Sequence, residues 1–112
     1  MTVSNLQVAE EVGNLRASIE KKLENLQVGS SFGLEVVVDS STKYGFEVVT
    51  RDSTVFITDL DGNAGLYVTI GAKSFLMARE GEANIATLLS AGEIKIRGDI
   101  SQLDNFQNIS LS

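Results

Sequence analysis

The chain has 112 residues, of which 43% are hydrophobic and 21% charged, a composition typical of one globular domain with its own core. We therefore expect a single domain over residues 1–112. The formal net charge of −6 argues against nucleic acid as a partner, because phosphates require a basic surface. The chain has no His and no Cys, which removes the usual nucleophile–base pairs and thiolate metal sites. The composition favours binding over catalysis and predicts neither a metal nor a cofactor.

No stretch approaches the roughly 20 apolar residues needed to span a bilayer. The N-terminus also lacks the basic and apolar regions of a secretory signal. We therefore expect a cytoplasmic protein without a transmembrane segment. Strong binding to an anionic membrane is disfavoured by the acidic charge, but weak contact through a mobile apolar helix stays open. The sequence does not fix the oligomeric state.

A stripe of apolar residues at helical spacing predicts a helix over residues 5–27. Ser4 followed by Gln7 suits a capping box, and Gly29 is placed to end the helix. The residues of the stripe are Val8, Val12, Leu15, Ile19, Leu23 and Leu26.

From Leu34 onward the apolar period changes to two, which is typical of strands with one buried face. Segments rich in Asp, Ser, Gly and Asn separate the apolar runs and predict short turns. We interpret the four runs as an antiparallel meander. Glu47 alternates with Phe46 and Val48, so we expect its side chain to point to solvent. The apolar runs are Leu34–Val38, Phe46–Val48, Val55–Ile57 and Leu66–Ile70.

After Gly71 the pattern predicts a short helix that contains Phe75 and Leu76, a second helix at 85–91, a strand at 94–97 and a last helix carrying Leu103 and Phe106. Asn84 can cap the second helix and Gly92 can end it, while Asp99 or Ser101 can cap the last. The order α–ββββ–αα–β–α predicts an α+β fold with a five-stranded, mainly antiparallel sheet and helices packed on one face.

The order of elements, and the stretch LLSAGEIKIRGD over residues 88–99 above all, resembles the sterol-carrier-protein type 2 family. In that family a helix ending in Gly leads into a short strand of alternating apolar and basic residues, closed by Gly-Asp or Gly-Asn. Together with Val68–Ile70, the helix entered at Ala72–Leu76 and the N-terminal helix, the resemblance covers about residues 12–109. The chain departs from the family in having Asn84-Ile85 where Asn-Pro is frequent, and in lacking a Trp in the central strands.

The resemblance implies a sterol-carrier-like cavity between the sheet and the helices that takes sterols, fatty acyl chains, isoprenoids or similar lipids. Sites of this kind are concave and mostly apolar, so they need no sharp polar motif. Arg79 or Arg97 could pair with an anionic head group at the cavity mouth. We expect the cavity to be lined by apolar side chains that converge in this layout, although the same residues could form a filled core: Phe46, Val48, Phe75, Leu76, Leu89, Ile96, Leu103 and Phe106.

Three hypotheses follow for the function. The first is a domain that binds a hydrophobic small molecule as its partner, with intracellular transfer of that molecule as an extension of the same hypothesis. The second is an enzyme or accessory protein acting on a hydrophobic biosynthetic intermediate, for which Glu47, Asp59 and Asp99 are the carboxylates to test. The third is a self-association domain with a collapsed core. Asp59–Asn63 resembles a fragment of a calcium loop but lacks the remaining ligands, so no metal site is predicted.

Overall fold

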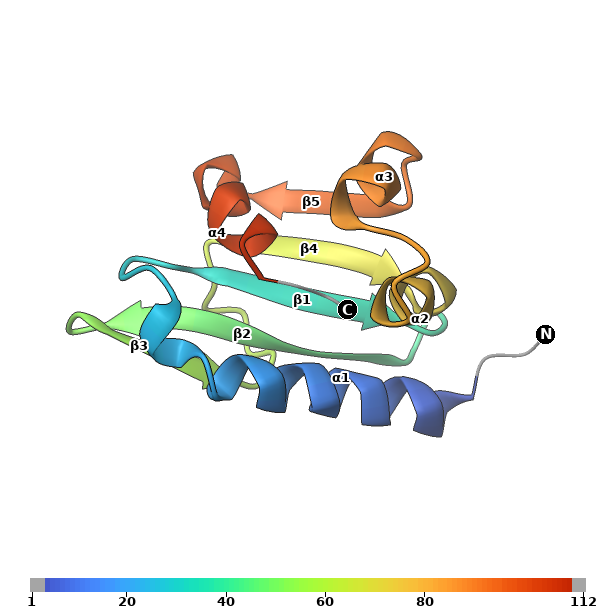
Figure 1. The fold of residues 1–112 in the computed structure, drawn as a ribbon, viewed down its shortest axis with the longest axis horizontal. Coiled ribbons are helices and arrows are strands. Elements are labelled where there is room, and N and C mark those ends of the chain that lie inside the picture. Colours follow the sequence, from blue (N-terminus) through green and yellow to red (C-terminus); the bar gives the residue numbers. More distant parts are fainter. Residues whose placement is uncertain (1–3, 110–112) are drawn as a thin grey trace.

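The computed structural model describes residues 4–109 and consists of one sheet with helices over one of its faces (Figure 1). In chain order the elements are α1 (Asn5–Glu20), the 3₁₀ helix η1 (Leu23–Asn25), β1 (Phe32–Val37), β2 (Lys43–Arg51), β3 (Thr54–Thr58), β4 (Leu66–Gly71), α2 (Ala72–Arg79), α3 (Ile85–Ser90), β5 (Ile94–Gly98), the 3₁₀ helix η2 (Ile100–Gln102) and α4 (Leu103–Gln107). The predicted fold class is confirmed.

The strands lie in the order β3-β2-β1-β4-β5, and β1 and β4 run parallel while the other neighbours are antiparallel. The predicted meander is therefore wrong at one connection, since β4 pairs with β1 and not with β3. The loop 59–65 carries the chain from the β3 edge across β2 and β1 to the far side. Leu60 of this loop lies over Gly45, where a β-carbon would come within 2.9 Å of its methyl group.

The N-terminal helix is shorter than the sequence predicts. α1 ends at Glu20, because Lys22 leaves the helical region at a φ of −116° and the chain tightens into η1. Leu23 and Leu26, expected on the helix, still pack against the core from η1 and the residue after it. The predicted cap at Ser4 occupies the N-cap position without a capping hydrogen bond from its side chain. Asn84 does cap α3, since its Oδ1 accepts from the N–H of Thr87 at 2.8 Å.

The core lies between the inner face of the sheet and the helices. Alternate residues of the strands face inward, as the period of two predicts, and meet the apolar stripe of α1 together with side chains of the shorter helices. Phe32 of β1 and Phe106 of α4 pack edge to face, with ring centroids 5.7 Å apart. α4 is thus held to the sheet although it has only five residues.

The β2–β3 hairpin turns through two residues in left-handed conformations, Asp52 at φ 50° and Ser53 at φ 63°. Asp-Gly is a favoured pair for such a turn, because glycine adopts this conformation at little cost. We expect Ser53→Gly to stabilise the protein by about 0.5–1 kcal/mol, seen as a higher urea midpoint with an unchanged slope. Ser40→Gly, in an exposed loop at a φ that is not positive, is the matched control and should bring no gain.

Candidate functional site

All eight apolar residues predicted to line a cavity belong to one hydrophobic cluster between the sheet and the helices. Four are fully buried at 0% exposure and four are partly buried at the edge of the cluster. The buried four are Phe46, Val48, Phe75 and Phe106, and the partly buried four are Leu76, Leu89, Ile96 and Leu103. The structure therefore brings the eight side chains together in the packed core. That they contact a ligand stays a prediction.

The hollows on the helix-covered face lie beside this cluster. The first, of about 490 Å³, lies between α1–η1 and the end of α4. The second, of about 690 Å³, lies between the end of α2, the segment leading into α3 and the same end of α4. Asn108 and Ile109 line both, so the two hollows flank the turn that follows α4. None of the nine predicted site residues lines either hollow.

The first hollow combines an apolar floor with a polar rim. Ile19 and Ile109 are 5% and 7% exposed and belong to the core cluster, and the partly buried Leu26 packs against it. Because these side chains also line the hollow, its floor is continuous with the core. The rim carries Ser18, Lys22, Asn25, Gln27, Ser30, Asn105 and Asn108. This hollow was not predicted from the sequence, because it depends on α1 ending at Glu20, whereas the apolar stripe continues unbroken to Leu26.

The two arginines considered as head-group partners are engaged elsewhere. Arg97 lies on the outer face of the sheet, where its Nη2 donates to Oε1 of Glu35 at 3.0 Å and its guanidinium lies 4.8 Å from the ring centroid of Tyr67. Lys43 donates to the other oxygen of Glu35 at 2.9 Å. Arg79 is only 15% exposed and faces α1, with its Nε 3.8 Å from Oε2 of Glu11.

No protein-family model matches the sequence, and no curated protein matches it at a significant level. Solved structures do match. The second sterol carrier protein domain of Helicoverpa armigera superposes with a TM-score of 0.69 at 17% identity, covering 98% of this chain and 91% of that one. Palmitated SCP2L2 from Aedes aegypti gives 0.62 at 16% identity, covering 96% and 94%. This chain has the fold of sterol carrier protein 2 domains. The resemblance noted from the sequence is confirmed at the level of the fold.

A third structure with this fold is described as UbiJ-SCP2, a ubiquinone synthesis protein. It superposes with a TM-score of 0.52 at 20% identity, covering 88% of this chain and 94% of that one. Proteins with this fold thus include one that is named for a biosynthetic pathway. The fold alone therefore does not determine the function.

Glu47 is fully buried on the outer face of this sterol-carrier fold, so the expectation that it points to solvent is wrong. It does lie opposite Phe46, as alternation predicts, but the loop 59–65 covers it. Its Oε2 accepts from the N–H groups of Asp61 and Gly62 and from Tyr67 Oη at 2.8–2.9 Å, and its Oε1 accepts from Asn63 N at 3.1 Å. Burial raises the pKa of Glu47, but these hydrogen bonds outweigh it and hold the pKa below its usual value.

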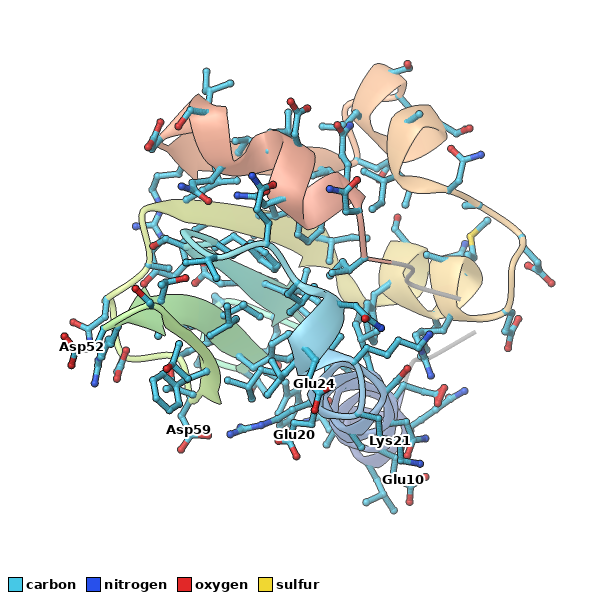
Figure 2. The ribbon with its side chains drawn as sticks, turned by 60° about the vertical axis from the view of Figure 1, so that its left-hand side comes forward. Glu10, Glu20, Lys21, Glu24, Asp52 and Asp59 are labelled. Atoms are coloured by element: carbon cyan, nitrogen blue, oxygen red, sulfur yellow. The ribbon has the colours of Figure 1, made fainter. Side chains whose placement is uncertain are left out.

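The other two carboxylates singled out for chemistry also have structural partners. Asp59 pairs with Arg16 of α1, which donates from Nη1 at 2.6 Å and also reaches Glu20, and Figure 2 shows both acids on the same side of the molecule. Asp99 caps η2 and accepts from the hydroxyl group of Ser101 at 2.7 Å and from its backbone N–H at 3.0 Å, and these two hydrogen bonds lower the pKa of its carboxyl group. Each of the three carboxylates thus has structural partners, and none of them lines either hollow.

Within residues 4–109, no three Asp or Glu side chains are grouped so that they could hold a metal ion. The backbone amides of the Asp61–Asn63 turn point at Glu47, which gives the calcium-like fragment a structural role. None of the helices in this part of the chain is long and apolar enough to cross a membrane.

Proposed function

We propose that the chain binds a hydrophobic small molecule, such as an acyl chain, an isoprenoid or a sterol, in the first hollow. The observation that carries this proposal is the solvent-open apolar floor of Ile19, Leu26 and Ile109, continuous with the core of a sterol-carrier fold. The solved neighbour described as palmitated supports an acyl chain as one occupant. Intracellular transfer of the ligand and a cytoplasmic location belong to the same proposal.

The short helices give an extended chain a way into the core. α3 has six residues and α4 five, which is too short for either helix to be stable without tertiary packing. A small displacement of α4 would open the hollow toward Leu89, Ile96 and Leu103, the partly buried side chains at the edge of the core. Burial of ten methylenes would contribute about 8 kcal/mol before ordering costs, which corresponds to a dissociation constant of about 1 μM. A chain longer than ten methylenes would therefore be needed to offset the ordering costs and keep the affinity in the micromolar range.

Filling the first hollow tests the proposal. Ser18 lines it from α1, so Ser18→Trp should weaken binding of a fluorescent acyl probe by at least about tenfold, because the indole occupies the space of the chain. Ala17→Trp places the same side chain on the adjacent, exposed position of α1 outside both hollows and should bind like the unmodified protein. Equal affinities of the two variants would contradict binding at this hollow.

Native mass spectrometry of the freshly purified protein, followed by organic extraction, identifies a bound ligand class. An added mass that extracts as a fatty acid, isoprenoid or phospholipid supports the proposal. A protein that shows only its own mass of 12.0 kDa and does not bind fluorescent acyl probes would overturn the proposal. Concentration-dependent size on a column would then favour the self-association domain.

A second candidate is an accessory protein that confines a hydrophobic biosynthetic intermediate, favoured by the ubiquinone synthesis protein with this fold. This second function requires the same hollow. It predicts that the protein converts such an intermediate itself or stimulates its conversion by an enzyme. Activity measured in Glu47→Gln, Asp59→Asn and Asp99→Asn separates a carboxylate mechanism from confinement. Unchanged turnover in all three variants would leave confinement as the mechanism.

A further inference from the structure

The charge around the two hollows limits which head group a lipid can carry. Among the described residues that line them, Lys22 is the one cation, and Glu82 is the one carboxylate. Arg97 is on the opposite face of the sheet, held to Glu35, and Arg79 is turned toward Glu11 of α1. The whole chain carries a net charge of −6, so its field repels anions. Glu82 lines only the second hollow, so Lys22 is the one charged residue among the described residues that line the first. The ammonium of Lys22 is exposed and screened by water, so it offers an ionised carboxylate little attraction against the net negative charge of the chain.

Side-chain amides dominate the rim of the first hollow instead. Asn25, Gln27, Asn105 and Asn108 surround the floor of Ile19, Leu26 and Ile109. Within residues 4–109 the side chains of Asn25, Gln27 and Asn108 form no hydrogen bond to another protein group. Asn105 uses its Nδ2 toward Gln102 at 2.8 Å, which leaves its Oδ1 to accept.

Amides match a neutral, hydrogen-bonding head group better than a charged one. Each offers two N–H donors and a carbonyl acceptor, so one rim can satisfy both the hydroxyl donors and the ester or ether acceptors of a ligand. Four amides converge here on one apolar floor. Their spread over η1, the segment after it and α4 places donors and acceptors on two sides of the hollow.

We infer that the first hollow selects a lipid with an uncharged hydroxyl- or ester-bearing head, such as a glyceride or a lipid alcohol, over a free fatty acid. This inference rests on the proposed function, because it names the class of ligand for the same hollow. The apolar floor holds the chain, and the amides of Asn108 and Gln27 hold the head group from opposite sides.

Competition between ligands with the same chain tests the inference. The neutral dye 1-N-phenylnaphthylamine is bound to the protein at pH 8, where a dispersed fatty acid carries its charge, and is displaced by monopalmitoylglycerol, methyl palmitate or palmitic acid below their aggregation limits. We expect monopalmitoylglycerol to displace the dye at a concentration at least tenfold lower than palmitic acid. Methyl palmitate, which lacks a hydroxyl donor, should fall between them.

The double variant Gln27→Leu/Asn108→Leu separates head-group recognition from chain binding. Both side chains are exposed, so the variant should fold. It should lose the preference for monopalmitoylglycerol over palmitic acid, while methyl palmitate, which offers only an ester acceptor, should lose less affinity than monopalmitoylglycerol. Gln7→Leu, an exposed amide on α1 outside both hollows, is the control and should keep the preference.

Palmitic acid that binds as tightly as monopalmitoylglycerol would overturn the inference and leave the proposed function standing. Loss of that binding in Lys22→Gln would then identify the lysine as the partner of the carboxylate. If none of the three lipids displaces the dye and none binds on direct titration, the proposed function itself fails. The two failures are therefore distinguishable.

Discussion

Glu47→Gln should lower the free energy of unfolding by about 3 kcal/mol and the midpoint of thermal unfolding by roughly 10 °C. The carboxylate is fully buried and accepts four hydrogen bonds, three of them from consecutive backbone amides of the loop 59–65. Glutamine keeps one acceptor oxygen and turns an NH₂ group toward N–H donors. Some of these buried donors then lose their partner, and the loop that carries the chain to β4 loses its attachment to β2.

The same carboxylate makes stability depend on pH in a defined direction. Its folded pKa is lowered from an ordinary value of 4.5, so its contribution is complete above that value and is lost as the pH falls through the lower, folded pKa. The difference in stability between the unmodified protein and Glu47→Gln should therefore be constant near neutral pH and shrink below about pH 4. Glu35, whose pKa is also lowered against the effect of its burial by Lys43 and Arg97, remains in both proteins and cancels in the difference.

Glu24→Gln is the matched control, because Glu24 is exposed on η1 (Figure 2). It should unfold within about 0.5 kcal/mol of the unmodified protein. Urea unfolding at pH 7 and at pH 3.5 measures both effects. A Glu47→Gln variant with the stability of the Glu24→Gln control would mean that the loop is not anchored by this carboxylate.

Local patterns were enough to predict the order of the longer helices and strands and the inward-facing residues of the central strands, but not the end of α1 at Glu20 or the two 3₁₀ helices. The period of two places Leu34, Phe46 and Val68 inside, and all three are at most 1% exposed. Asn84 caps α3 as predicted. Asp99, proposed with Ser101 as the cap of the last helix, instead caps η2, and α4 has Gln102 at its N-cap without a capping hydrogen bond from the side chain.

Non-local relations were not predictable in the same way. The parallel pairing of β1 with β4 depends on where the loop 59–65 crosses the sheet. The local sequence of a strand does not indicate which other strand lies beside it. Alternation placed Glu47 on the correct face, but only the loop decides that this face is covered. The hollow likewise arises from the early end of α1 and the turn after α4, which are brought together by folding.

Within the stretch 88–99, which first indicated the fold, Gly98 is the position where adding a methyl group should lower the free energy of unfolding most. It ends β5 at a φ of +104°, a conformation that other residues adopt only with strain. A β-carbon there would also contact the carbonyl oxygen of Gly65 and lie 3.4 Å from Cα of Leu66, its partner on β4. The next residue, Asp99, donates its N–H to that same carbonyl at 2.8 Å and caps η2.

We expect Gly98→Ala to destabilise the protein by about 2–4 kcal/mol, from the strained φ together with the displaced strand end. Gly13→Ala is the control of opposite sign, because Gly13 is exposed within α1 with no other atom near its missing β-carbon, and the change should stabilise by about 0.5–1 kcal/mol. Since α4 follows Gly98 and η2, and Asn105 of α4 together with Asn108 and Ile109 after it lines one side of the first hollow, Gly98→Ala should also weaken lipid binding where the protein is still folded. Urea midpoints of both variants, measured with and without a bound acyl chain, check the two effects together. Equal midpoints for Gly98→Ala and the unmodified protein would contradict the close approach of β5 to Gly65.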